Sequence, residues 1–223
     1  MFFSSGKKMA DQQWIKRQIN DPYVKKAREE SWRCRSAFKL MEIDDKHSIL
    51  KPGHIVIDCG AAPGSWSQVA VHRVNSLGKD PGPTGSVIGI DLQHMMPVEG
   101  ATMLHQSDFT SHETQKSLLT MLDGSKADLV MSDMAPNPVG VKTVDHTAIV
   151  KLCKSALKFA ANVLQLNGTF LCKLWEGNER NDLEKLMRIV FKQVRVVKPL
   201  ASRSDSAEIF LLAKHFKGLP PKR

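Results

Sequence analysis

The sequence predicts a single α/β domain built on a mostly parallel, doubly wound sheet. Short β-branched runs alternate with longer segments of helical periodicity along most of the chain, and this alternation requires a parallel sheet with helices on both faces. Four of the expected strands end at, or shortly before, an aspartate. With 223 residues and 42% hydrophobic side chains, the chain can bury a full core.

The elements of the first half follow from apolar spacing and turn residues. Residues 1–40 have helical periodicity, with a break at Asn20-Asp21-Pro22. The run His-Ile-Val-Ile-Asp at 54–58 is bounded by turn residues and is typical of a buried parallel strand. Ser65 follows a Gly/Ala/Pro loop and is expected to be a helix N-cap. The remaining elements expected here are a helix at 65–75, strands at 87–91 and 102–105, and a helix at 111–122.

The second half continues the alternation. A strand over 127–133 ends in Asp133. It is followed by a helix at 146–164, a strand at 169–174, a helix at 179–190, and strands at 194–197 and 208–213. Only ten residues separate the last two strands, which leaves no room for a helical crossover, so this pair should be antiparallel. The expected sheet has seven strands, with the last one antiparallel.

The positive charge of the chain is concentrated near its ends. The formal net charge is +9; residues 1–39 hold ten Lys/Arg against four Asp/Glu, and residues 185–223 hold ten against two. This distribution fits a polyanionic partner such as nucleic acid, although charge alone does not decide, because many basic proteins bind no anion. We expect a basic helical extension over residues 1–40, a main domain over 41–214 and a basic tail over 215–223.

Several other classes have little support. No apolar run approaches the ~18 residues that cross a bilayer, so we expect no membrane association. No H-E-x-x-H or C-x-x-C motif occurs, so we expect no metal. The first residues are too few and too polar for a secretory signal peptide and lack the arginines of a mitochondrial presequence, although a truncated chain would look the same. We expect free thiols, as in a reducing compartment, at Cys34, Cys59, Cys153 and Cys172.

The strand ends predict a site for a nucleoside cofactor without phosphates. Ligands of open α/β sheets bind at the carboxyl ends of the strands, where Asp91, Asp108 and Asp133 lie. No P-loop is present, and Ala62 replaces the second glycine of the dinucleotide fingerprint in the loop at 58–64. We expect Asp91 to bind ribose hydroxyls and Asp108 the adenine amino group. The alternative, that each aspartate only caps the next helix, is weaker for three acids in register.

Five segments carry a family resemblance: 35–40 (RSAFKL), 58–67 (DCGAAPGSWS), 132–137 (SDMAPN), 168–173 (GTFLCK) and 202–208 (SRSDSAE). In this order they resemble the FtsJ/RrmJ family of S-adenosylmethionine-dependent RNA ribose 2′-O-methyltransferases, over about residues 21–214. The resemblance implies a Rossmann-like class I methyltransferase fold, with S-adenosylmethionine as cofactor and residues 41–214 as the methyltransferase domain.

The resemblance also implies the site residues. The family's Lys-Asp-Lys-Glu tetrad would fall on Lys39, Asp133, Lys173 and Glu208. The residues implied in cofactor binding are Pro63, Gly64, Ser65, Trp66, Asp91, Asp108, Phe109 and Asp133.

Two further features resemble one branch of the family. Met134 and Asn137 resemble the branch that acts on ribosomal RNA, and the longer loop at 78–85 resembles its mitochondrial members that methylate a uridine of large-subunit rRNA. The implied partner is ribosomal RNA or a precursor of the large ribosomal subunit, and the implied state is a monomer. The implied location is the mitochondrial matrix, with the bacterial cytoplasm as the alternative.

Such a tetrad suits transfer to a ribose 2′-hydroxyl. This poor nucleophile must be oriented in line with the sulfonium methyl and relieved of its proton. A neutral lysine can take that proton, and a second lysine together with partial desolvation lowers a lysine pKa. We therefore expect Lys173 to be the base or the orienting group, and Asp133 to position it. Lys39 and Glu208 would support them.

Two other function classes remain open. One is a methyltransferase of the same fold that acts on a small molecule or a protein. The basic termini disfavour it, and residues 133–137 (DMAPN) lack the aromatic residue that stacks on a planar target nitrogen in many amino-group methyltransferases. The other is a non-catalytic RNA-binding or ribosome-assembly protein. The complete tetrad argues against lost catalysis but leaves room for an additional assembly role.

Overall fold

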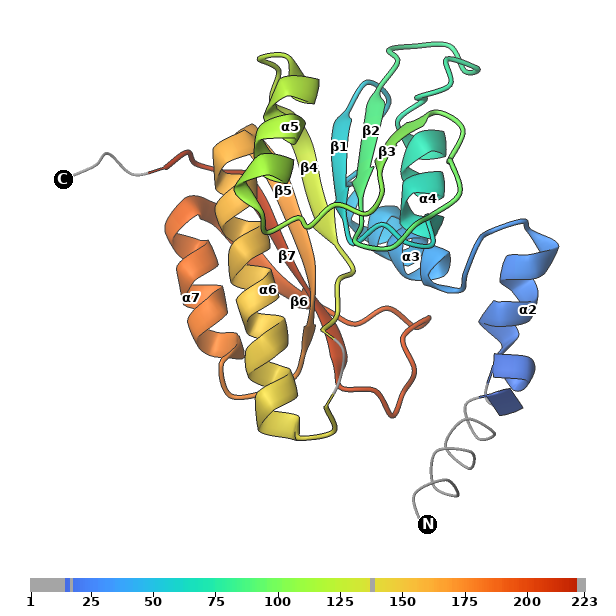
Figure 1. Cartoon of the computed structure of the whole chain (residues 1–223), viewed down its shortest axis with the longest axis vertical. Coiled ribbons are helices and arrows are strands. Elements are labelled where there is room, and N and C mark those ends of the chain that lie inside the picture. Colours follow the sequence, from blue (N-terminus) through green and yellow to red (C-terminus); the bar gives the residue numbers. More distant parts are fainter. Residues whose placement is uncertain (1–14, 17, 137–138, 220–223) are drawn as a thin grey trace.

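The structure, a computed structural model, describes residues 15–16, 18–136 and 139–219 (Figure 1). Its helices are α2 (Pro22–Glu29), α3 (Ser36–His47), α4 (Ser65–Arg73), α5 (His112–Leu122), α6 (Lys142–Val163) and α7 (Arg180–Val190). Its strands are β1 (Ile55–Cys59), β2 (Ser86–Ile90), β3 (Ala101–Leu104), β4 (Ala127–Ser132), β5 (Leu164–Trp175), β6 (Phe191–Val197) and β7 (Glu208–Phe216). Every element expected after residue 53 is present, with ends displaced by at most five residues.

The strands form one seven-stranded sheet in the order β3-β2-β1-β4-β5-β7-β6. Neighbours from β3 to β5 are parallel. β7 is antiparallel to both of its neighbours, β5 and β6. The predicted mostly parallel sheet with an antiparallel last strand is confirmed. That β7 lies between β5 and β6 does not follow from the apolar pattern of the sequence.

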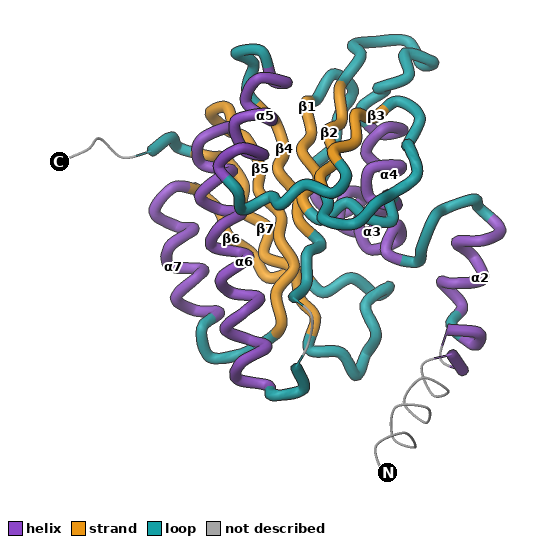
Figure 2. Tube along the Cα trace, in the orientation of Figure 1, coloured by secondary structure: helices purple, strands orange, loops and turns teal. Residues whose placement is uncertain are grey.

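Helices cover both faces of the sheet, and each face has its own core (Figure 2). One core includes Leu118 of α5, Ile149 of α6 and Leu183 of α7. The other includes Leu40 of α3 and Val69 of α4. Burial of such side chains is the main stabilising contribution to the fold. No helix in the described ranges is long and apolar enough to cross a membrane.

Two strands are longer than the apolar pattern predicted. β5 begins at Leu164, which pairs with Ala127 of β4, and a register shift follows where Asn167 has a φ of 69°. β7 continues to Phe216, which pairs with Phe191 of β6. Apolar periodicity reports side-chain burial, whereas ladder pairing is a property of the backbone. The sequence analysis therefore ended these strands where the apolar runs end.

The N-terminal helices are attached to the main domain. The proposed boundary after residue 40 falls inside α3, whose Leu40 and Ile43 belong to one core. α2 begins after the expected break, with Asp21 as N-cap. The Asp21 carboxylate also pairs with Arg35 at 3.1 Å and with Arg203 at 3.4 Å. The start of the expected extension and the last four residues of the basic tail, 220–223, lie outside the described residues.

Candidate active site

A cavity of about 710 Å³ opens at the carboxyl ends of β1, β2 and β4. Ligand pockets in proteins typically span about 300–1,000 Å³. The apolar wall includes Phe109 and Met134, and the polar lining includes Asp91, Asp108 and Asp133. The cavity is therefore bordered by the three aspartates that the sequence analysis placed at one edge of the sheet.

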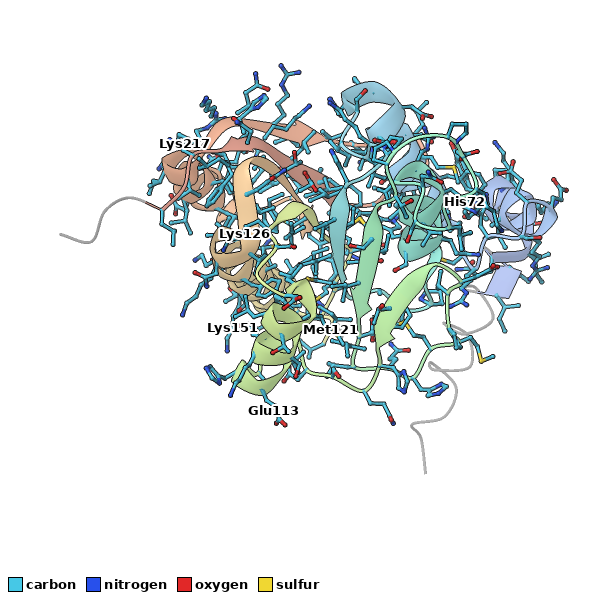
Figure 3. All side chains as sticks on the ribbon, turned by 90° about the horizontal axis from the view of Figure 1, so that it is seen from above. His72, Glu113, Met121, Lys126, Lys151 and Lys217 are labelled. Atoms are coloured by element: carbon cyan, nitrogen blue, oxygen red, sulfur yellow. The ribbon has the colours of Figure 1, made fainter. Side chains whose placement is uncertain are left out.

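One wall of the cavity comes from α6. Lys151 of this helix, beside α5 in Figure 3, is the one cation among the described lining residues. Ser155, one turn further along α6, also lines the cavity. No motif in the sequence distinguishes Lys151 and Ser155 from other polar positions on a helix, so neither residue was predicted to lie at the site.

Asp91 directly follows β2 and holds the first loop in place. Its Oδ2 accepts a hydrogen bond from the Ala62 amide at 2.9 Å, and its Oδ1 accepts one from the Gln93 amide at 2.7 Å. No helix lies between β2 and β3, so Asp91 is not a helix cap. A carboxylate oxygen accepts more than one hydrogen bond, so Asp91 remains able to bind hydroxyl groups.

Asp108 also does more than cap a helix. The N-cap of α5 is Ser111, whose side chain accepts from the Thr114 amide. The Oδ1 atom of Asp108 accepts from the amide and the hydroxyl of Thr110, at 2.8 and 2.7 Å. These bonds orient the carboxylate, and Asp108 lines the cavity. The capping alternative therefore does not account for Asp108.

Residues 63–66 do not line the cavity, whereas Gly60 and Ala62 do. Trp66 is buried, and its Nε1 donates to the Ser36 carbonyl at 2.9 Å. The Ser65 hydroxyl lies 3.0 Å from the Cys34 thiol. The N-cap of α4 is Gly64, with a φ of 110°, so the expected Ser65 cap was wrong by one position. A backbone position with a positive φ favours glycine, because glycine has no Cβ. The N-cap of α4 is therefore Gly64 and not Ser65.

Asp58, at the start of the same motif, is fully buried beneath the loop. The Ser67 hydroxyl donates to its Oδ2 at 2.7 Å, and its Oδ1 has no hydrogen-bond partner among the described residues. Burial raises the pKa of Asp58 to about 7; the Ser67 hydrogen bond opposes the increase, and Asp133 and Asp91 add to it. Asp58 is thus a buried carboxyl group that titrates near neutral pH.

The order of the strands brings together the predicted tetrad. Asp133 follows β4, Lys173 lies in β5, and Glu208 begins β7, and these three strands are adjacent. Because β7 is antiparallel to β5, its first residue lies at the edge where the parallel strands end. Lys39 comes from α3, which packs with α4 against one face of the sheet.

The tetrad forms two ion pairs. The ammonium group of Lys173 lies 3.0 Å from Asp133 Oδ1 and also donates to the Asp133 backbone carbonyl. The Lys39 ammonium group lies 2.6 Å from Glu208 Oε1. The four side chains are only 11–18% exposed. Burial by itself would raise the pKa of Asp133, but the charges of Lys173 and Lys39, together with hydrogen bonds from Ser36 and Lys173, hold that pKa below its usual value.

Two serines that the sequence analysis did not single out complete these pairs. The Ser36 hydroxyl donates to Asp133 Oδ2 at 2.6 Å. The Ser202 hydroxyl donates to Glu208 Oε1 at 2.8 Å. Each acid of the tetrad is therefore fixed by one lysine and one serine. Ser36 lies in the segment at 35–40 and Ser202 in the segment at 202–208, so the motifs that predict the four charged residues also contain both serines.

The sequence also predicted that the chain holds no metal, and the family resemblance singled out Met134 and Asn137, which follow β4. Within the described ranges, no group of three or more His, Cys, Asp or Glu residues is arranged to hold a metal ion. Met134 lines the cavity, and a Cβ at Gly60 would lie 2.3 Å from its Cγ, so this close approach requires glycine. Asn137 lies outside the described residues.

The sheet order, the cavity at its carboxyl edge and the two Lys–acid pairs define the class: a methyltransferase with a Rossmann-like fold. The sequence profile of the FtsJ-like methyltransferases matches residues 32–216. The chain belongs to this family.

Individual relatives agree with this assignment. Mitochondrial rRNA methyltransferase 2 of Drosophila melanogaster is 49% identical over 214 residues, which cover 96% of this chain and 86% of the relative. Ribosomal RNA large subunit methyltransferase E of Parvibaculum lavamentivorans is 51% identical over 208 residues, covering 92% and 81%. The crystal structure of a ribosomal RNA methyltransferase from Plasmodium falciparum superposes with a TM-score of 0.75 and 29% identity, covering 84% of this chain and 100% of that one.

Proposed function

We propose that the chain transfers a methyl group from S-adenosylmethionine to a ribose 2′-hydroxyl of ribosomal RNA. The observation that carries this proposal is the ion pair between Lys173 and Asp133, because Asp133 also lines the cofactor-sized cavity. A lysine is thus held at the border of the place where a methyl donor would bind. A buried lysine at that border is suited to act on a hydroxyl group.

The cavity fits a nucleoside that carries a positive charge. Three aspartates face one lysine in its lining, and this excess of negative charge complements a sulfonium. Asp91, Asp108 and Phe109 all line the cavity, which supports a role for Asp91 in binding the ribose hydroxyls and for Asp108, with Phe109, in binding the adenine. When bound, S-adenosylmethionine supplies an electrophilic methyl group. Residues 63–66 would act indirectly, by supporting the loop whose residues Gly60 and Ala62 line the cavity.

In this proposal Lys173, held by Asp133, orients the ribose 2′-hydroxyl or accepts its proton. Because the pKa of Asp133 is lowered, this carboxylate is ionised at neutral pH and holds Lys173 in place. As an ammonium group, Lys173 can orient the ribose by donating to the 2′-oxygen. It can abstract the hydroxyl proton only after losing one of its own to solvent. The abstraction role therefore requires a rate that rises with pH, whereas the orienting role does not.

The identity of the RNA rests on different support. Two relatives are named as ribosomal RNA methyltransferases, one of them mitochondrial and one acting on the large subunit. We extend this to a uridine in large-subunit rRNA or a precursor of that subunit, in the mitochondrial matrix or, alternatively, the bacterial cytoplasm. Lys25, Lys26 and Arg28 on α2 supply exposed positive charge for the phosphate backbone.

Substitution of Lys173 tests the proposal. In Lys173→Ala, transfer of labelled methyl groups to a large-subunit rRNA transcript should fall by about 10²–10⁴-fold, because the group that acts on the hydroxyl is lost. Lys173→Arg should not restore the rate, because a guanidinium does not deprotonate near neutral pH. Binding of S-adenosylmethionine and of the transcript should stay close to that of the wild type.

Lys154→Ala, at an exposed position on the same helix as Lys151, is the matched control and should transfer at the wild-type rate. A Lys173→Ala variant with a normal single-turnover rate would remove Lys173 from the chemistry. A wild-type protein that binds the transcript without methylating it would favour a non-catalytic assembly protein.

A further inference from the structure

A second cavity lies apart from the active site, between the end of α3 and the two outer strands, and we call it the α3–β6 cavity. Its volume is about 180 Å³. Among the residues that the structure describes, no acid lines it, and five of its six lining side chains can donate hydrogen bonds. The lining residues are Lys46 and His47 of α3, Gln193 and Arg195 of β6, and Leu212 and Lys214 of β7.

The acids nearest to this cavity along α3 are already engaged. Asp44 and Asp45 both pair with Arg73, at 3.6 and 2.6 Å. Within the described residues, Lys46 and Arg195 form no ion pair. Their charges are therefore available to an anion from solution.

Lys214 and His47 both line the cavity and contact each other. The Lys214 ammonium group donates to the His47 backbone carbonyl at 2.9 Å, which offsets the negative end of the α3 dipole. The Nε2 atom of His47 is buried without a hydrogen-bond partner among the described residues. Burial, together with the charges of Lys46, Lys214 and Arg195, lowers the pKa of His47. A buried polar atom without a partner, beside several cations, is the kind of lining that suits an anion.

The α3–β6 cavity lies on the same side of the sheet as the Lys39–Glu208 pair. Lys39 and Lys46 are seven residues apart on α3, so they share a face of the helix about 10 Å apart. Glu208 and Lys214 are six residues apart on β7, so they share a face of the sheet about 20 Å apart. One strand of RNA can span these distances with a few nucleotides.

We propose that the α3–β6 cavity binds a phosphate group of the RNA backbone, a few nucleotides from the ribose held at the tetrad. Its volume is below the range of pockets for larger ligands, which favours one phosphate over a whole nucleotide. The inference rests on the proposed function, because it places a second contact on the same RNA. In this arrangement the α3–β6 cavity anchors the RNA, and the tetrad carries out the methyl transfer.

The test removes two cations from the cavity. The double variant Lys46→Gln/Arg195→Gln and the wild type are titrated with a single-stranded RNA of mixed sequence over a range of salt concentrations. The variant should bind about tenfold more weakly at low salt, and the slope of log affinity against log salt should fall by about 0.7, the value for one phosphate contact on a single strand. Binding of S-adenosylmethionine should be unchanged.

The matched control is Lys116→Gln/Lys192→Gln, which removes the same charge from exposed positions outside the cavity and should keep the wild-type slope. An unchanged slope and affinity in Lys46→Gln/Arg195→Gln would overturn the proposal. Binding of inorganic phosphate by the wild type that is lost in this variant, with no change in its RNA binding, would also overturn it in favour of a free-anion site. Failure of the wild type to methylate RNA would instead count against the proposed function.

Discussion

Replacement of Asp58 by asparagine should change how the stability of the protein depends on pH. Asp58 is fully buried, and its pKa is raised from 3.8 to about 7, mainly by burial. In the unfolded chain this carboxyl group ionises near its ordinary pKa. Between these two values the folded state therefore holds a proton that the unfolded state has lost, so the contribution of Asp58 to stability decreases as the pH rises.

The magnitude follows from the shift in pKa. A difference from 3.8 to about 7 is roughly three pH units, and each unit corresponds to about 1.4 kcal/mol. The wild type should therefore lose ~4 kcal/mol, relative to Asp58→Asn, between about pH 4 and pH 7. The asparagine oxygen can still accept from Ser67, while its amide group meets no acceptor at the Oδ1 position. That second effect is independent of pH, so it shifts the curve without changing its slope.

The assay is urea unfolding of both proteins at several values of pH from 4.5 to 8. The free energy of unfolding of Asp58→Asn minus that of the wild type should rise with pH and level off above about pH 7. Asp123→Asn, which changes an exposed aspartate at the end of α5, should show no such trend. If the curves of Asp58→Asn and the wild type stay parallel over this range, Asp58 is ionised throughout and the reasoning from burial is refuted.

Three further sets of variants probe the cavity, the tetrad and the surface of α2. Asp91→Ala should weaken binding of S-adenosylmethionine by ~1.5–3 kcal/mol, the value of hydrogen bonds to a charged group, and unchanged affinity in calorimetry would exclude Asp91 from the cofactor site. Ser36→Ala should slow methyl transfer about tenfold, whereas Ser36→Thr should keep most of the rate, because Asp133 loses a hydrogen bond only in the first; equal rates in a single-turnover assay would show that this bond has no catalytic effect. Reversal of charge at Lys25, Lys26 and Arg28 should lower RNA affinity and flatten its salt dependence, and a wild-type salt slope would show that α2 is not a contact surface.

The place of the site could be predicted from the sequence because it depends on local signals. Asp91 and Asp133 each follow an apolar strand, and parallel strands end at a common edge. β2 and β4, the two strands that flank β1, therefore bring the acids that follow them to one cavity, whatever the details of packing. The position of Asp108 was found in the same way, and the structure adds that Ser111 relieves it of helix capping.

The partners of these acids could not be predicted in the same way, because they come from distant parts of the chain. Ser36 and Asp133 are separated by 97 residues, and their contact depends on how α3 packs against the sheet. Lys151 reaches the cavity only because α6 crosses that edge. Periodicity predicts that a helix packs on a sheet, but it does not give the angle or register that brings a particular polar side chain to a site.

The position of β7 decides how the tetrad is assembled. A strand that is antiparallel to β6 can pair on either side of it, so the sequence did not determine which side β7 takes. Because β7 pairs with β5, its first residue, Glu208, lies at the same edge of the sheet as Lys173 of β5. The tetrad then consists of two neutral ion pairs, next to a cavity in which negative charge predominates. Neither part attracts a polyanion, so the proposed function predicts that the affinity for RNA comes from basic residues elsewhere, such as those of α2 and the α3–β6 cavity. Substitutions of those residues should therefore change RNA binding while the chemical step at Lys173 remains intact.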